Sequence, residues 1–273
     1  MPELPEVQTV VNTLSPRLVG GTFRRVAHVR PDILRPRGFD LIGALIGRSV
    51  SKIARRGKRI VVTLDDGNAF YVHLGMTGQL KIVTAAAAAA PIEPHTHFIA
   101  DLASGAQLRF RDPRRFGGIF WLGHEASPGE ARMGPEPLTM TPAQLAAKLS
   151  RTKRAVKNAL MDQNVVAGLG NIYVDESLFA AGIHPLKRAD RLKPDEITRL
   201  TKAIKLTLNR AIRHRGSTLR DYVDADGERG GFQNLHRVYA REGEPCRTCA
   251  TPLKRIVLGG RSTHFCPKCQ RRR

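Results

Sequence analysis

The chain begins with a methionine, a proline and a glutamate, Met1, Pro2 and Glu3. A small residue after Met1 favours removal of this methionine, which would leave Pro2 with a free secondary amine. An α-amino group has a pKa of about 8, against about 10.4 for a lysine side chain, so much of it is neutral at physiological pH. Such an amine can attack a sugar carbon and carry an iminium intermediate, while Glu3 handles protons. The alternative is an ordinary chain start in which Pro5 and Glu6 open a helix.

Four cysteines near the end of the chain form two pairs, each with two residues between its members: Cys246, Cys249, Cys266 and Cys269. The two pairs are separated by 16 residues. This spacing is typical of one tetrahedral zinc ion held by four thiolates, and a site with no open position is structural. Two disulfides are the alternative, which a reducing cytosol disfavours.

The region around these cysteines is strongly basic. From Cys246 to Arg273 it contains eight basic residues and no acidic one, and a predicted hairpin tip at 258–263 carries Arg261. A zinc-bound basic hairpin can lie against a phosphate backbone or enter the minor groove of DNA. The alternative is a solvated finger with a purely structural role, but the charge of the whole chain favours DNA contact.

The whole chain carries 45 Lys and Arg against 24 Asp and Glu, a net charge of +21. This excess predicts a polyanionic partner, and nucleic acid is the first candidate. The start of the chain does not resemble a signal peptide, and no apolar run approaches the ~18 residues needed to cross a bilayer. We therefore expect a cytoplasmic protein without a membrane partner.

Three further segments have the composition of DNA contacts. The glycine-containing turn 166–171 precedes a predicted helix, where backbone N–H groups can bind phosphate, although such turns are usually structural. The run 55–59 places four basic residues at the start of a strand, and a solvated surface is the usual role of such a run. The loop 111–118 sets arginines beside Phe116, which suits a wedge into a base stack unless Phe116 is buried.

Periodicity divides the chain into a β-rich first half and a helical second half. Apolar residues at helical spacing predict a helix from Pro5 to Leu18. Short β-branched and aromatic runs then predict strands at 50–54, 60–64, 69–74, 98–102, 107–111 and 118–122. The alanine run 85–90 is interpreted as a loop insertion. Helices are expected at 153–163, 171–181 and from 194 to about 216, with Gly182 ending the second.

These elements predict an α+β multidomain protein. The expected parts are an antiparallel β-sandwich with an N-terminal helix at 1–125, a linker at 126–139, a helical domain at 140–239 and a zinc finger at 240–273.

Taken together, the chain resembles the bacterial formamidopyrimidine-DNA glycosylase family, which also contains endonuclease VIII. The resemblance covers nearly the whole chain and rests on motifs that match in order and spacing. These are Pro2–Val7, Arg56–Lys58, His73–Gly78, Asp112–Gly117, Asp162-Gln163, Gly168–Tyr173, Glu176, Gly260–Thr263 and the four cysteines.

The resemblance implies a β-sandwich and a helical domain with a helix–two-turn–helix motif and a zinc β-hairpin, with duplex DNA in the cleft between them. It implies base excision repair of oxidised purines, chiefly 8-oxoguanine and formamidopyrimidines, followed by strand cutting through β,δ-elimination. A monomer with one structural zinc ion is expected.

The family's functional residues carry over by position. The resemblance implies that Pro2 is the nucleophile on C1′ of the damaged nucleotide, that Glu3 is the neighbouring acid or base, and that Lys58 and Arg261 contact phosphate and assist elimination. The implied DNA contacts are His95, Arg115, Lys153 and Asn171. The residues implied to fill the gap left by the flipped base are Met76, Arg114 and Phe116. Flipping is required because a stacked base hides the attacked carbon.

Alternatives remain within and beyond this family. An endonuclease VIII-like enzyme for oxidised pyrimidines shares the proline, the glutamate and the zinc hairpin, but Leu4 and the 112–117 loop favour the purine enzyme. A catalytically silent DNA-damage binder would keep the fold and retain Met1. His97 competes with His95 as the DNA contact, and the glycine-rich loop 217–233 is expected to cap the lesion.

Overall fold

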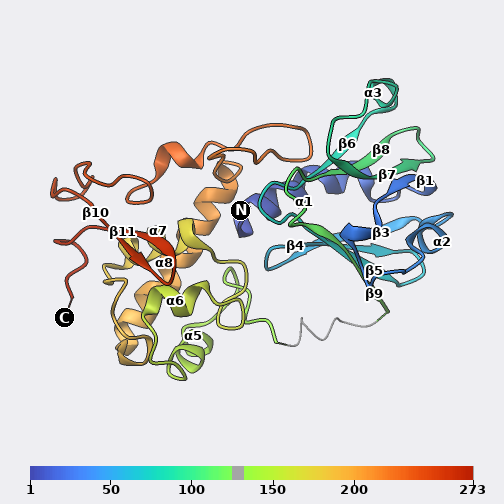
Figure 1. Ribbon diagram of the computed structural model, residues 1–273. Helices are drawn as coiled ribbons and strands as arrows, with labels where there is room; N and C mark the ends of the chain where they lie inside the picture. The colour runs from blue at the N-terminus through green and yellow to red at the C-terminus, as the bar shows by residue number, and fades with distance from the viewer. Residues whose placement is uncertain (125–131, 273) are drawn as a thin grey trace. The chain divides into compact units, whose positions relative to one another are not determined.

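The computed structural model describes residues 1–124 and 132–272. The chain divides into two compact units, the first made of Met1–Ala131 with Arg215–Gly231 and the second of Arg132–His214 with Phe232–Arg273. Figure 1 labels their elements along the chain. Residues 126–131 of the predicted linker 126–139 and the last residue of the predicted finger lie outside the described residues.

The first unit is a β-sandwich opened by helix α1 (Leu4–Leu18). One antiparallel sheet has the order β1 (Phe23–Val29), β7 (Thr96–Leu102), β8 (Gln107–Arg111), β6 (Gln79–Val83). The other has the order β2 (Leu34–Arg35), β9 (Gly118–Gly123), β5 (Ala69–His73), β4 (Arg59–Leu64), β3 (Val50–Arg56). Short helices accompany them: η1 (Pro31–Ile33), α2 (Leu41–Leu45) and α3 (Ala85–Ala88). The predicted β-sandwich is confirmed, with β2 and β9 as a short parallel pair.

Burial explains why these segments fold together. Val7, Val10, Leu14 and Leu18 recur on one side of α1, and all four are fully buried. They form a single apolar cluster with residues of both sheets. In β4 the burial alternates residue by residue, as expected for a strand with one face toward a core. The first helix therefore packs against the sandwich that follows it in the sequence.

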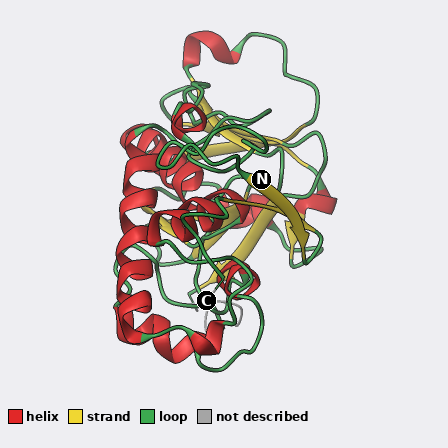
Figure 2. Ribbon diagram, turned by 90° about the vertical axis from the view of Figure 1, so that its left-hand side faces the viewer, coloured by secondary structure: helices red, strands yellow, loops and turns green. Residues whose placement is uncertain are grey.

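The second unit is mainly helical. Its helices are α5 (Pro142–Leu149), α6 (Val156–Met161), α7 (Asn171–Ala181) and α8 (Pro194–Arg213), with the 3-10 turns η2 (Ala189–Arg191) and η3 (Phe232–Leu235). Helices α7 and α8 pack against each other. The hairpin β10 (Lys254–Leu258) and β11 (Arg261–Phe265) follows near the C-terminus. Figure 2 colours the helices red and the strands yellow.

Local signals define the ends of these helices. Thr141 and Gln144 form a capping box at the start of α5. Gly182 ends α7 with a φ of 68°, a left-handed conformation that favours glycine, as predicted. Helix α6 is shorter than the predicted 153–163, because the backbone N–H of Val156 donates to the carbonyl of Lys187 at 2.7 Å instead of continuing a helix from 153.

The segment 215–231 corrects the predicted domain boundaries, because it belongs to the first unit and not to a helical domain running from 140 to 239. Tyr222 and Ala225 are part of the apolar core of the sandwich. The backbone N–H of Ala225 donates to Thr13 Oγ1 of α1 at 3.2 Å. Apolar burial and this hydrogen bond hold the segment against the N-terminal helix.

Among the helices in the described parts of the chain, none combines the length and the apolarity of a membrane span.

Candidate functional site

Pro2 and Glu3 lie at the start of α1, and both residues are buried. The backbone N–H of Glu3 donates to Glu6 Oε2 at 2.8 Å. Glu6 is itself 2% exposed and lies in the first turn of the helix, where the positive end of the helix dipole favours a carboxylate. Pro5 has no backbone N–H, but it lies in the first turn, where backbone N–H groups have no partner within the helix. It therefore removes no hydrogen bond of the helix.

The second oxygen of Glu6 holds the segment 215–231. Glu6 Oε1 accepts the backbone N–H of Ser217 at 2.7 Å. Gly216 has a φ of 77°, and a Cβ placed there would lie 2.6 Å from Glu6 Oε1, so this approach requires glycine. The hydroxyl of Tyr222 donates to the backbone carbonyl of Glu6 at 3.1 Å. Burial, and then the nearby Glu6 charge, raises the pKa of Tyr222, so it stays a neutral donor.

Lys58 follows Gly57 in the turn between β3 and β4, and it is 9% exposed. Arg55, at the end of β3, donates from Nε to Gln8 Oε1 of α1 at 2.9 Å. This bond places the first turns of α1 beside the turn that carries Lys58. Burial lowers the pKa of His73, and the charges of Lys58 and Arg59 lower it further. The lowered pKa favours the neutral form of His73 beside these two basic side chains.

Two adjoining loops of the first unit carry the proposed wedge residues. Met76 is 39% exposed and Phe116 is 59% exposed, although both are large and apolar. The guanidinium of Arg114 lies over the ring of Phe116, 4.6 Å from its centroid. The alternative of a buried Phe116 is therefore wrong. Exposed apolar side chains next to an arginine suit insertion between bases.

Asp112 joins these two loops from below the surface. It is fully buried, and its carboxylate accepts the hydroxyl of Thr77 and the backbone N–H of Gly117, the latter at 2.7 Å. The backbones also touch closely, because a Cβ on Gly75 would lie 2.4 Å from the nitrogen of Gly117. Met76 and Phe116 thus project from loops that are fixed to each other.

The structure distinguishes the two histidines that competed in the sequence. His97 is buried, and its Nε2 lies 2.9 Å from the backbone carbonyl of Asp112. His95 is exposed and has a φ of 67°. Arg115 is also exposed, and it pairs with Asp32 at 2.9 Å. Of the two histidines, His95 therefore remains available to an external ligand.

In the second unit, Lys157 is fully buried, which the sequence did not indicate. Its Nζ donates to Asp175 Oδ1 at 2.6 Å and to the backbone carbonyl of Ser262 at 2.7 Å. The other oxygen of Asp175 accepts the backbone N–H of His264 at 2.9 Å. The apolar residues Val156 and Leu160 on either side of it are the local signal that could have indicated burial.

This buried network fixes the hairpin against the start of α7. Asn171 is the first residue of α7, and its Nδ2 donates to Ser262 Oγ at 3.3 Å. Its Oδ1 is buried without a hydrogen-bond partner in the described structure. Arg261 is exposed at the start of β11, after a turn of two glycines with positive φ. Lys153 is also exposed, just before α6. Asn171 and the hairpin tip are thus held together.

The four cysteines meet as predicted, and their sulfur atoms all lie within 4.8 Å of one another. The Sγ atoms of Cys249 and Cys266 are 3.5 Å apart, and those of Cys246 and Cys269 are 4.0 Å apart. Tetrahedral zinc with Zn–S bonds of about 2.3 Å requires sulfur atoms about 3.8 Å apart. The four thiolates fit one zinc ion with no open position.

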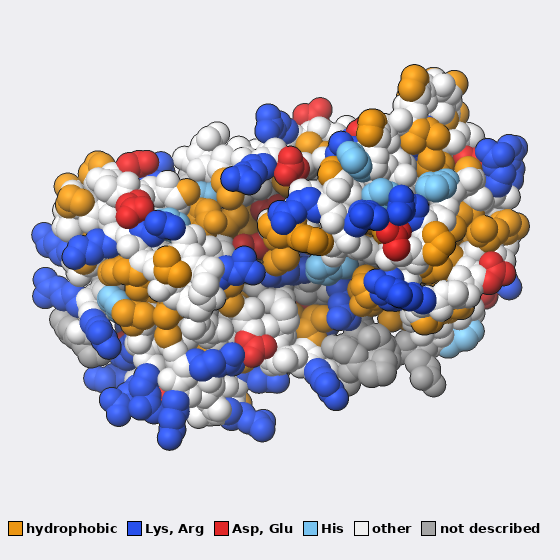
Figure 3. Space-filling view, in the orientation of Figure 1, with side chains coloured by type: hydrophobic (Ala, Val, Ile, Leu, Met, Phe, Trp, Pro, Cys, Tyr) orange, Lys and Arg blue, Asp and Glu red, His pale blue; other side chains and the backbone are white. Residues whose placement is uncertain are grey.

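Basic side chains cover much of the described surface, and Figure 3 shows many lysines and arginines on the visible face of each unit. The first unit supplies a buried Pro2 and Glu3, Lys58 in the turn after β3, and the exposed side chains of Met76 and Phe116. The second unit supplies a helix start and a basic zinc hairpin. These are the groups that amine chemistry on a polyanion requires.

Comparison with protein families agrees with this arrangement. Residues 1–119 match the formamidopyrimidine-DNA glycosylase N-terminal domain, and residues 133–223 match the H2TH domain of the same glycosylase. Residues 243–272 match the zinc finger found in FPG and IleRS. The cysteine site is therefore a zinc site.

Individual relatives match over their full length. The formamidopyrimidine-DNA glycosylase of Geobacillus kaustophilus is 46% identical, with 99% of this chain and 100% of that protein covered. The crystal structure of the MutM (FPG) protein from Thermus thermophilus has a TM-score of 0.87 at 40% identity, with 98% of each chain covered. Lactococcus lactis Fpg in complex with abasic-site DNA has a TM-score of 0.90 at 34% identity, covering 99% of this chain and 100% of that one. The chain belongs to the formamidopyrimidine-DNA glycosylase family.

Proposed function

We propose that this protein is a bifunctional DNA glycosylase and AP lyase that removes oxidised purines from duplex DNA in base excision repair. The observation that carries the proposal is the buried Pro2-Glu3 start of α1, held by Glu6, in a chain of this family. Relatives named formamidopyrimidine-DNA glycosylase, and a Lactococcus lactis complex with DNA containing Fapy-dG, support the choice of substrate.

In the proposed reaction, the damaged nucleotide is first flipped out of the stack. Flipping costs a few kcal/mol, and insertion of Met76, Arg114 and Phe116 into the gap offsets part of this cost. Exposed His95 and Arg115 bind phosphates in the first unit. Lys153, Asn171 and Arg261 do so in the second.

The chemistry then uses the amine of Pro2 after Met1 is removed. The amine attacks C1′ and displaces the base, which leaves with a proton. The C1′–O4′ bond then breaks, Glu3 supplies the proton that O4′ takes up, and an iminium joins protein and opened sugar. The iminium makes the neighbouring C–H acidic, so elimination expels one phosphate, and a second elimination expels the other. Lys58 and Arg261 stabilise the departing phosphates.

The decisive experiment is borohydride trapping, which reduces the iminium to a stable covalent adduct. Two forms of the protein differ only in a short uncleaved extension, placed either before Met1 or after Arg273. The N-terminal extension acylates Pro2 and leaves every residue unchanged. We expect an adduct on duplex with 8-oxoguanine opposite cytosine only from the C-terminally extended form, after intact mass confirms loss of Met1.

The outcomes separate the alternatives. Equal trapping by both forms would show that another amine is the nucleophile. An adduct mainly on oxidised thymine would favour an endonuclease VIII-like enzyme. DNA binding without an adduct on either duplex would indicate a catalytically silent damage binder. One chain supplies all the proposed groups, so the proposal includes action as a monomer, which light scattering of the DNA complex checks.

A further inference from the structure

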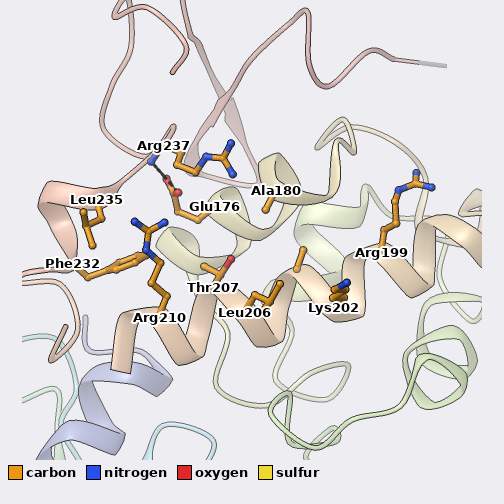
Figure 4. A pocket seen from close by; sticks show the side chains of 11 residues that line it. Glu176, Ala180, Arg199, Lys202, Leu206, Thr207, Arg210, Phe232, Leu235 and Arg237 are labelled. Atoms are coloured by element: carbon orange, nitrogen blue, oxygen red, sulfur yellow. Dashed lines mark hydrogen bonds between the residues drawn. The ribbon is translucent and has the colours of Figure 1, made fainter. Parts of the chain in front are cut away.

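A groove of about 390 Å³ on the second unit has no part in the reaction proposed above. It is lined by α7, α8 and the segment that begins with η3, and Figure 4 shows its side chains. Four of the lining residues are cationic: Arg199, Lys202, Arg210 and Arg237. Only one lining residue, Glu176, is acidic. The groove therefore has a strong excess of positive charge.

The single carboxylate of the groove is already occupied. Glu176 is 2% exposed, and it accepts the backbone N–H groups of Arg237, Val238 and Tyr239 at 2.9–3.0 Å. Burial raises the pKa of Glu176 against the effect of these donors. Its hydrogen bonds point to the loop after η3, as the dashed line in Figure 4 shows, and not to the cations. Glu176 shapes the wall but does not neutralise it.

The cations differ in how they are held. In the described structure, no carboxylate lies within ion-pair distance of Lys202 or Arg210. Arg199 forms an exposed pair with Asp195. Arg237 lies over the ring of Phe179 at 4.4 Å, so its guanidinium has a fixed position. At least two cations of the groove thus lack an internal counter-ion.

Between the cations the groove is apolar. Leu206 exposes 60% of its surface in the middle of α8. Leu235 and Phe232 line the opposite wall, and Figure 4 shows them across from Leu206. A leucine left open between lysine and arginine indicates a partner that brings both apolar and acidic groups.

The spacing along α8 gives the length of that partner. Arg199, Lys202, Leu206 and Arg210 line the same groove. At 1.5 Å per residue, the eleven steps from residue 199 to residue 210 extend about 16 Å. An extended peptide rises about 3.3 Å per residue, so about five residues span this length. A compact anion would reach only one end.

We propose that this groove binds a short acidic segment of a partner protein, with carboxylates at both ends and an apolar side chain at its centre. Carboxylates at the ends match Arg199 and Lys202 on one side and Arg210 and Arg237 on the other. The apolar centre covers Leu206. A DNA backbone matches less well, because its contacts are to phosphates and it gains nothing from the apolar middle.

The test is fluorescence anisotropy with the full-length, zinc-loaded protein at 0.15 M salt, where charges more than about 8 Å apart are screened. The probe is a labelled hexapeptide of two aspartates, leucine, phenylalanine and two glutamates. One control peptide replaces the apolar pair with serines, and another replaces the acidic residues with serines. We expect saturable binding of the probe and at least about tenfold weaker binding of both controls.

Variants assign the binding to the groove. The double variant K202E/R210E and the single variant L206S should each weaken probe binding by about tenfold. Lys205→Glu is the matched control, because it makes the same charge change on α8 outside the groove, and it should change binding less than about twofold. All variants should retain the thermal stability and lesion-cutting rate of the parent.

Four results would overturn the proposal. Equal binding of the probe and the serine-centred peptide would show that binding is only a general attraction between charges. The same conclusion would follow if Lys205→Glu weakened probe binding as much as K202E/R210E. Absence of saturable probe binding would remove the peptide site. Loss of lesion-DNA binding in K202E/R210E, with displacement of the probe by duplex DNA, would make the groove a DNA surface.

Discussion

Glu6 Oε1 accepts the backbone N–H of Ser217, which lies 211 residues later in the chain, at 2.7 Å. The other oxygen of the same carboxylate accepts the N–H of Glu3 at 2.8 Å. One buried side chain therefore fixes both the residue next to the proposed nucleophile and the segment 215–231. A change in that segment is expected to reach Pro2 through Glu6.

Replacing Glu6 tests this link. Glu6→Ala leaves two buried N–H groups without an acceptor, at a cost of about 1–3 kcal/mol each. We expect the free energy of unfolding to fall by about 2–5 kcal/mol in urea titrations, and by less in Glu6→Gln, which retains one acceptor oxygen. Glu93→Ala, at an exposed pair, should change it by about 0.5 kcal/mol or less. Equal effects of Glu6→Ala and Glu93→Ala would show that these bonds carry no stability.

Removing one partner of the buried ion pair of Lys157 and Asp175 should destabilise the fold far more than replacing both partners with apolar residues. Both side chains have 0% exposure. Lys157→Met leaves a buried carboxylate without its cation, and should cost about 3–5 kcal/mol. Lys157→Met with Asp175→Leu should cost clearly less than the two single changes added together. The exposed pair of Arg199 and Asp195 is the control, with a coupling of about 0.2–1 kcal/mol. Additive effects at the buried pair would contradict its role.

Replacing Asp112 should slow excision of the damaged base more than cleavage of a preformed abasic site. Asp112→Asn removes one acceptor oxygen and loosens the loops that carry Met76 and Phe116. We expect single-turnover excision of 8-oxoguanine to slow by about tenfold or more, since a small misplacement of positioning groups has large effects. Cleavage of a preformed abasic site should change little. Asp101→Asn, in β7, is the matched control. Equal slowing on both substrates would indicate damage to the chemistry itself.

His236 should make stability depend on pH in the mildly acidic range. Burial lowers the pKa of His236 to about 4, from 6.5. Because the folded state holds His236 neutral, its contribution to stability is fully present above about pH 6.5 and is lost as the pH falls toward 4. The expected loss is on the order of 2–3 kcal/mol. Urea midpoints of the parent at pH 7 and pH 4.5 should therefore differ more than those of His236→Gln. Identical pH dependence would exclude His236 as the cause.

Zinc removal should act on the hairpin that carries Arg261. Cys246, Cys249, Cys266 and Cys269 supply the ligands, and folding of such fingers depends on the metal. We expect one zinc per chain by mass spectrometry. Chelation, or Cys249→Ser, should abolish protection of β10 and β11 against hydrogen exchange and weaken DNA binding. Full DNA binding by the zinc-free protein would show that the hairpin is not a DNA contact.

Much of this protein could be predicted from local sequence. Helix α7 was expected at 171–181 and occurs at Asn171–Ala181, because an apolar run precedes a glycine that can adopt positive φ. Strand β8 lies at the predicted Gln107–Arg111. The cysteine spacing predicted the zinc site, since the chain between the pairs closes on itself as a hairpin. Each of these depends on interactions between residues close in sequence.

Other features depend on contacts across the fold, which no local pattern encodes. The sequence placed 215–231 with the helical domain, but apolar burial of Tyr222 and Ala225 puts it in the sandwich core. Lys157 is buried because it pairs in the interior with Asp175 of α7, 18 residues later in the chain. The groove on α8 exists only because η3 and α7 form its other wall. Residue types and spacing determined the family, the zinc ligands and the candidate nucleophile. Burial and long-range hydrogen bonding decided which charges are internal and which face a ligand.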